Sequence, residues 1–155
     1  MKSKYACNGL ATMFAVALLI SAAAPAHAGG PPCSLARAAG TWGFTDNGTV
    51  VGVGPRIAVG VLTLDSAGNV VNGTATSSLN GSIANETFSG TYTVNHDCTG
   101  TISVTIYSGG VELFVINGNT VFDSDMKHIR AIFTSVTEPN GTSLATVIGL
   151  DGNKQ

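Results

Sequence analysis

Apolar and polar residues alternate with period two through most of the chain after residue 40, and turn-forming residues separate the alternating runs. Successive side chains of a strand point to opposite faces, so this alternation predicts strands with one buried face. Asn80-Gly81 is a strong hairpin signal, because both central positions of a type I′ turn need a positive φ. The alternating apolar positions are Ile57, Val59 and Val61; Tyr92 and Val94; Ile102, Val104 and Ile106; Val111, Leu113 and Val115; Ile129, Ala131 and Phe133; and Leu144 and Ile148. The pattern predicts about eight or nine strands.

The turns between successive strands are short, which predicts a meander of antiparallel neighbours. Such a meander either closes into an up-and-down barrel or folds into a two-layer sandwich. Few prolines or charged residues are available to guard an exposed strand edge, and closure removes such edges. We therefore predict an all-β fold, a single antiparallel up-and-down β-barrel of about eight strands, with a two-layer β-sandwich as the alternative. The one short helix candidate runs from Ser34 to Ala39.

The N-terminus has the three parts of an export signal. Lys2 and Lys4 precede a short apolar run over residues 10–20, and Ala26-His27-Ala28 fits the small-x-small cleavage pattern. The apolar run is too short for a comfortable membrane span, and no charge cluster follows it, so we expect no stable span after cleavage. The prediction divides the chain into a signal peptide (1–28), a leader with a short helical turn (29–39) and a barrel domain (40–155). It places the protein in the periplasm or outside the cell.

Signal cleavage also leaves an even number of cysteines. Cys7 is lost with the signal peptide, and the mature chain keeps Cys33 and Cys98. Two thiols in an oxidising compartment predict one disulfide. The chain has no CxxC pair, and two isolated sulfurs make a poor zinc site, so we predict no metal at these cysteines.

The charge balance of the mature chain argues against nucleic acid as a partner. Residues 29–155 contain five basic and nine acidic residues, which give a formal charge of −4. Such a surface does not attract phosphate backbones. The pattern does not fix an oligomeric state.

Gly40-Thr41-Trp42, after the short helical turn, resembles the Gly-x-Trp signature of lipocalins and related calycin barrels. In those proteins the tryptophan closes the base of the barrel, and a late arginine stacks on it. The resemblance therefore implies a stack of Arg130 on Trp42, with a cation–π contact. An ordinary core aromatic is the alternative interpretation of Trp42.

A second resemblance covers nearly the whole mature chain and is to a family of small secreted bacterial β proteins without an assigned activity. Members usually have proline before the Asp-Cys-Thr-Gly turn, where this chain has His96. The resemblance implies export, the β fold and the disulfide, and it implies no catalytic residues. The similar blocks are Cys33-Ser34-Leu35-Ala36, Gly40-Thr41-Trp42-Gly43-Phe44-Thr45, Gly90-Thr91-Tyr92-Thr93-Val94, Asp97-Cys98-Thr99-Gly100-Thr101 and Arg130-Ala131-Ile132-Phe133-Thr134-Ser135.

No residue pattern predicts catalysis. The chain has no Gly-x-Ser-x-Gly elbow, and we expect Asp97 to bind backbone amides of its own turn. The segment 123–125, Asp-Ser-Asp, lacks the further oxygen ligands of a calcium site. Three glutamates have no evident acid–base partner: Glu86, Glu112 and Glu138. We therefore predict no catalytic residue, no cofactor and no metal.

The predicted function is non-enzymatic binding of one small, neutral, largely apolar molecule inside the barrel. A neutral ligand is expected because few charged side chains are available inside to neutralise an ionic one. Two alternatives stay open: a structural or surface-interaction protein with a filled barrel, and a small-barrel cyclase or isomerase. The expected cavity wall comprises Val59, Tyr92, Ile102, Val104, Leu113 and Phe133.

Overall fold

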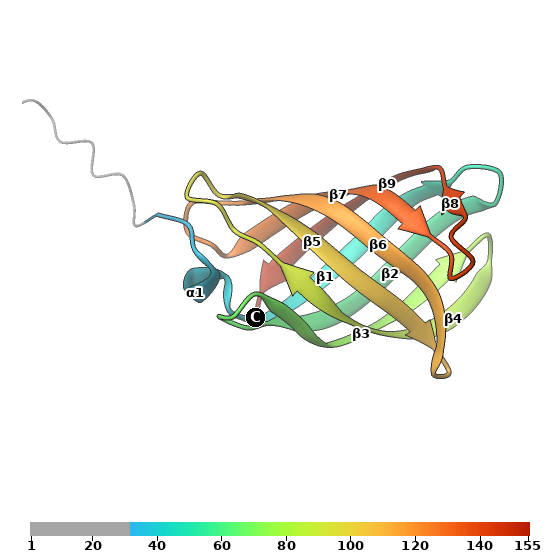
Figure 1. Ribbon diagram of the computed structural model, residues 1–155, viewed down its shortest axis with the longest axis horizontal. Coiled ribbons are helices and arrows are strands. Elements are labelled where there is room, and N and C mark those ends of the chain that lie inside the picture. Colours follow the sequence, from blue (N-terminus) through green and yellow to red (C-terminus); the bar gives the residue numbers. More distant parts are fainter. Residues whose placement is uncertain (1–31) are drawn as a thin grey trace, which may run out of the picture.

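The computed structural model describes residues 32–155. The predicted signal peptide and residues 29–31 lie outside the described residues. One four-residue helix, α1 (Leu35–Ala38), precedes nine strands (Figure 1). The strands are β1 (Gly40–Val50), β2 (Gly54–Leu64), β3 (Asn69–Leu79), β4 (Ser82–Tyr92), β5 (Thr99–Ser108), β6 (Val111–Phe122), β7 (His128–Thr137), β8 (Ser143–Leu144) and β9 (Thr146–Lys154). Within this part of the chain, no helix is long and apolar enough to cross a membrane.

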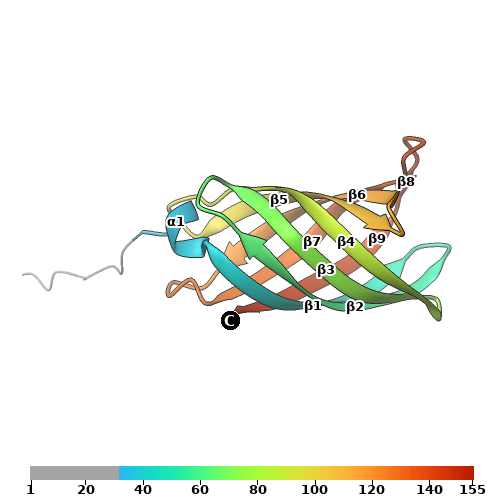
Figure 2. The same ribbon diagram turned by 90° about the horizontal axis from the view of Figure 1, so that it is seen from below.

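The strands form a closed antiparallel barrel of eight strands, which confirms the predicted fold class. Strands β1 to β7 pair in sequence order, and β9 pairs with both β7 and β1. Every barrel strand therefore has a neighbour on each side, unlike the edge strands of a sandwich (Figure 2). The two-residue strand β8 is additional and pairs only with β7.

The hairpin turns follow the local sequence. Asn80 and Gly81 have φ values of 50° and 87°, so the predicted turn between β3 and β4 is present. At the turn before β5, the Asp97 carboxylate accepts hydrogen bonds from the Thr99 amide at 3.1 Å and the Thr99 hydroxyl at 2.6 Å. These bonds hold the pKa of Asp97 below its usual value. The expectation that Asp97 serves its own turn is confirmed.

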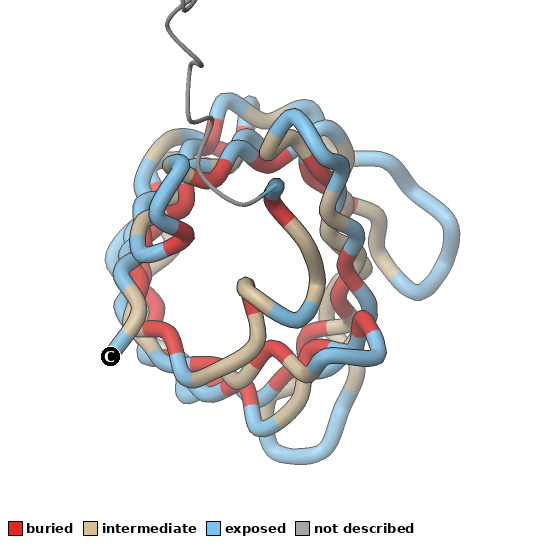
Figure 3. The backbone as a smooth tube through the Cα atoms, turned by 90° about the vertical axis from the view of Figure 1, so that its left-hand side faces the viewer, coloured by how far each residue is buried: buried red, intermediate tan, exposed pale blue. Residues whose placement is uncertain are grey.

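The hydrophobic core lies inside the barrel. Figure 3 looks along the barrel from the α1 end and shows the backbone as a closed ring along which buried and exposed segments alternate. Phe44 meets Phe88 edge-on, with ring centroids 5.8 Å apart, and Trp42 meets Phe122 in the same way. The Trp42 pair lies at the α1 end, where the Trp42 indole donates to the Ala38 carbonyl at 2.9 Å.

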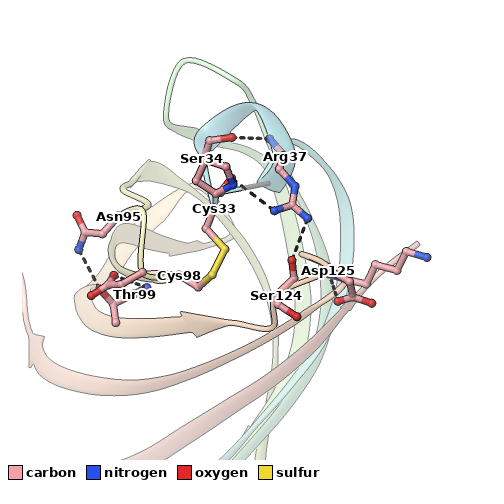
Figure 4. The surroundings of a disulfide bond; sticks show 11 residues. Cys33, Ser34, Arg37, Asn95, Cys98, Thr99, Ser124 and Asp125 are labelled. Carbon is pink, nitrogen blue, oxygen red and sulfur yellow. Dashed lines mark hydrogen bonds between the residues drawn. A yellow bond between two sulfur atoms is a disulfide. The ribbon is translucent and has the colours of Figure 1, made fainter. Parts of the chain in front are cut away.

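Helix α1 covers one end of the barrel and is attached to several strands. Ser34 caps the helix, and Cys33 is bonded to Cys98, with a Cα–Cα distance of 5.0 Å (Figure 4). The predicted disulfide is therefore present. The Arg37 guanidinium donates to the Ser124 carbonyl at 2.9 Å, and Lys154 donates to the Arg37 carbonyl at 3.0 Å. These contacts hold a helix too short to be stable by itself.

Candidate functional site

The barrel contains a cavity of about 60 Å³ next to Trp42 and Phe44. Ile102, Val104 and Phe133, three of the six predicted wall residues, border it. Most of the wall is apolar: Trp42, Phe44, Leu62, Leu64, Ala75, Phe88, Ile102, Val104, Ile106, Ile116, Ile129, Ala131, Phe133 and Leu150. Four polar residues complete it: Asp46, Arg56, Glu86 and Thr120.

Val59 lies on the outer face of the barrel with 59% of its surface exposed, so its assignment to the wall is wrong. The cause is the register of β2 against β1, which pairs Trp42 with Leu62 and Phe44 with Gly60. Directly paired residues point to the same side of a sheet. Because the aromatic rings of β1 face inward, their partners, the even-numbered residues of β2, face inward too. Ile57, Val59 and Val61 consequently form an apolar stripe on the outer surface.

Leu113 and Tyr92 also lie outside the cavity wall. The β5–β6 register shifts between Ile106 and Tyr107, and the shift places Phe114 rather than Leu113 against the core. Tyr92 is buried, and its hydroxyl donates to the Asp65 carbonyl at 2.6 Å. Its polar contacts are therefore with the α1 end of the barrel. Burial and the nearby Asp65 charge raise the pKa of Tyr92 to about 12.

The predicted stack of Arg130 on Trp42 is absent. Trp42 is 1% exposed and faces the interior, whereas the Arg130 side chain is 62% exposed and donates to Asp123 at 2.9 Å. Arg130 pairs with Val121, an outward residue of β6, so the barrel wall separates the arginine from the tryptophan. The aromatic partner of Trp42 is Phe122, in a T-shaped contact with an interplanar angle of 72°.

A buried ionic cluster, formed by Asp46, Arg56 and Glu86, lies beside the cavity. Both Arg56 Nη atoms donate to Glu86, to Oε1 and Oε2, at 3.0 Å each. Arg56 also contacts Asp46, with Nη2–Oδ2 at 3.3 Å and Nε–Oδ1 at 3.2 Å. The Ser77 hydroxyl donates to Glu86 Oε1 at 2.6 Å. Glu86 therefore has the stronger set of partners, and the sequence-based view of Glu86 as isolated is wrong.

Three buried polar atoms of the wall have no hydrogen-bond partner among residues 32–155: Asp46 Oδ1, Arg56 Nε and Thr120 Oγ1. The Nε–Oδ1 contact is an ion pair without hydrogen-bond geometry. Burial raises the pKa of Asp46, and the Arg56 charge only partly opposes this effect. A buried polar group without a hydrogen-bond partner is costly. These three atoms are therefore unsatisfied polar groups on residues that border the cavity.

A second cavity of about 20 Å³ lies on the far side of Arg56, toward the end opposite α1. Arg56, Ile116 and Phe133 border both cavities, so the arginine forms part of the partition between them. The other residues around the second cavity are apolar: Val50, Leu79, Phe114, Val136, Leu144 and Ile148.

The outer surface carries a separate polar cluster around His128. Its ring nitrogens lie 2.8 Å from Asp151 Oδ2 and 3.3 Å from Asp123 Oδ2. The hydrogen bond from Arg130, followed by that from His128, holds the pKa of Asp123 below its usual value. Across residues 32–155, no three His, Cys, Asp or Glu residues are grouped as metal ligands.

Sequence reasoning missed the ionic cluster although the signal was present. Asp46 follows the core residue Phe44 by two positions, and Glu86 precedes Phe88 by two. Arg56 precedes the inward Ala58 by two positions in the same way. The period-two rule therefore places all three charges on the inward face, as it does the apolar residues beside them. The interior therefore holds one guanidinium and two carboxylates.

Comparisons with known proteins show the fold alone. No family model matches the chain, and no curated protein does. Among solved structures, EF1p2_mFAP2b bound to DFHBI is 15% identical over 79% of this chain and 100% of that chain, with a TM-score of 0.54. The redesigned β-barrels mFAP1 and mFAP0, each bound to DFHBI, are 18% identical with TM-scores of 0.49. They cover 79% and 76% of this chain, and 98% and 99% of their own.

Proposed function

We propose that this protein binds one small, largely apolar molecule inside its barrel, without catalysis. The observation that carries the proposal is the cavity beside Trp42, whose wall is mostly apolar but contains buried polar atoms without partners. Ligand sites typically combine an apolar wall with a few polar groups that fix orientation. EF1p2_mFAP2b, a barrel of similar fold, is bound to DFHBI, so a protein of this fold can bind a small molecule.

The volume limits the size of the ligand. An engineered apolar cavity of about 150 Å³ holds benzene, and drug-sized ligands need roughly 300 Å³ or more. A cavity of about 60 Å³ therefore suits a molecule of a few heavy atoms rather than a fatty acid. The expectation that the ligand is neutral rests on a small number of charged side chains inside the barrel, and the buried ionic cluster weakens that basis.

The small volume also favours a second candidate, a structural or surface-interaction protein whose barrel is essentially filled. One experiment separates the two. Methyl NMR of the disulfide-bonded protein under xenon pressure should show saturable shifts at Ile102 and Val104 if the cavity accepts a guest. Ala131→Leu, which fills the cavity from β7, should abolish these shifts. Val59→Leu enlarges an outward residue and should leave them unchanged. Absence of saturable shifts in the unaltered protein would support the filled barrel.

The location of the protein is part of the same proposal. The disulfide between Cys33 and Cys98 is compatible with an oxidising compartment outside the cytoplasm. Export by the predicted signal peptide, and membership of the secreted bacterial family, stay predictions. N-terminal sequencing of the exported protein should give Gly29 as the first residue, and an intact Met1 in the folded product would contradict the export proposal.

A further inference from the structure

The charges around the cavity do not balance. The buried charged residues of the described chain are Asp46, Arg56 and Glu86, with exposed fractions of 2%, 8% and 4%. One guanidinium faces two carboxylates, so the ionised cluster carries one net negative charge. A buried charge without compensation is strongly unfavourable, because the interior does not replace the water that solvated it.

The excess negative charge belongs to Asp46 rather than to Glu86. Glu86 accepts two parallel bonds from Arg56 and a third from Ser77, which satisfies both carboxylate oxygens. Asp46 receives one longer hydrogen bond from Arg56 at 3.3 Å, through Oδ2, and a backbone interaction from Ala58 that lowers its pKa. Its Oδ1 lies 3.2 Å from Arg56 Nε but has no partner with hydrogen-bond geometry among residues 32–155. Asp46 also borders the 60 Å³ cavity.

A second buried polar residue without a side-chain partner among residues 32–155 borders the same cavity. Thr120, 3% exposed and three strands from Asp46 around the barrel, also borders it, and its hydroxyl has no partner in the described part of the chain. The register connects the two residues through Leu150 of β9 and Ala131 of β7. Asp46 and Thr120 therefore lie on well-separated strands of one wall, with the apolar residues Leu150 and Ala131 between them.

We infer that the ligand is a small organic ammonium ion, with its charged head at Asp46 and its hydrocarbon part in the apolar cavity. This inference rests on the proposed binding function. An ammonium group has three hydrogen-bond donors and no acceptor, which matches a carboxylate oxygen without a donor. It also neutralises the cluster. The cavity volume limits the hydrocarbon part to roughly two to four carbon atoms.

Other ligand charges fit the cavity less well. An anion would add to the net negative charge, and Glu86 already occupies both Nη atoms of Arg56. A calcium ion requires six or more oxygen ligands, but the described residues contain no group of metal-ligating side chains. A neutral alcohol would provide one donor and leave the charge unbalanced.

The test compares isosteric probes of different charge in the disulfide-bonded protein. Ethyl-, propyl- and butylammonium, the alcohols of equal length and propionate are titrated at pH 7, with the methyl resonances of Ile102 and Val104 as the readout. We expect the best ammonium probe to bind at least about tenfold more tightly than its alcohol, and propionate to show no saturable shift. Alcohol binding equal to ammonium binding would overturn the inference and leave the proposed function intact.

A matched pair of variants locates the charged contact. Asp46→Asn keeps the shape of the side chain and removes its charge, so the preference for ammonium over alcohol should fall to within about threefold. Asp151→Asn removes a carboxylate from the outer surface and should retain the preference. An ammonium preference that survives Asp46→Asn would overturn the assignment to Asp46. If Asp46→Asn does not fold, the probe comparison in the unaltered protein decides. If xenon, alcohols and ammonium ions all fail to bind, the proposed function fails as well.

Discussion

Replacing Arg56 by methionine tests whether the ionic cluster is as buried as its contacts indicate. Methionine has a similar length and no charge, so it fills the partition between the two cavities and removes the only buried cation of residues 32–155. Asp46 and Glu86 then face each other without a counterion in an environment that excludes water. Three hydrogen bonds from the guanidinium are lost at once.

The expected cost follows from the burial of the two carboxylates. They are 2% and 4% exposed, and removal of one partner from a buried ion pair typically costs about 3–5 kcal/mol. We expect the Arg56→Met variant to lose that amount of unfolding free energy at pH 7. Without the cation that lowers it, the pKa of Asp46 should rise further above its unfolded value. The folded variant then binds protons more readily than the unfolded chain, so its stability should recover as the pH falls toward about 4.

Urea denaturation at several pH values measures both effects, with Arg130→Met as the matched control. Arg130 is exposed and pairs with an exposed Asp123, so its replacement should change stability little at any pH. If Arg56→Met loses less than about 1 kcal/mol at pH 7, the carboxylates are hydrated and the description of a buried cluster is wrong.

Three further changes have defined outcomes. Thr120→Val keeps the side-chain shape and removes a buried hydroxyl without a partner, so it should raise the free energy of thermal unfolding by about 1 kcal/mol; a loss would mean that a bound group satisfies the hydroxyl. The pKa of Asp46 is raised above 3.8, so the free energy of unfolding should fall as the pH rises from 3.8 through the raised pKa. Urea midpoints measured against pH should show this fall in the unaltered protein and a flatter profile in Asp46→Asn. Cys98→Ser opens a loop of about 66 residues and should cost about 4 kcal/mol in urea unfolding; two reactive thiols in the unreduced, unfolded protein would contradict the disulfide.

Much of the fold was predictable because the barrel repeats one simple unit. Alternation located the strands, Asn80-Gly81 located a turn, and short connections indicated antiparallel neighbours. The face of each strand was harder to assign. On β2 the outward residues Ile57, Val59 and Val61 are more apolar than the inward Ala58 and Gly60, so hydrophobicity alone selects the wrong face. Only the pairing with the aromatic residues of β1 decides the orientation, and that pairing is a long-range property.

The site was less predictable than the fold for two physical reasons. The register between β5 and β6 shifts at Ile106 of β5, and the shift changes which β6 residues face the core. The sequence of this segment contains no signal for the shift. The ionic cluster joins Asp46, Arg56 and Glu86 from three strands, so each charge appears isolated along the sequence. Each residue of the ionic cluster lies two positions from a core residue on its own strand. The alternation therefore predicts an inward side chain for each of them when polar positions are counted.

The way the barrel closes also has a consequence for how the chain folds. Each pairing from β1 to β7 joins consecutive strands, but the β1–β9 pairing brings residue 42 next to residue 154. Local hairpins can form early, whereas this contact must overcome the entropy of closing nearly the whole chain. Until β9 inserts between β7 and β1, both strands have an unpaired edge that can recruit another chain. Aggregation during folding should therefore depend on how quickly β9 inserts, and substitutions in β9 should affect the yield of folded protein more than equivalent substitutions in β3.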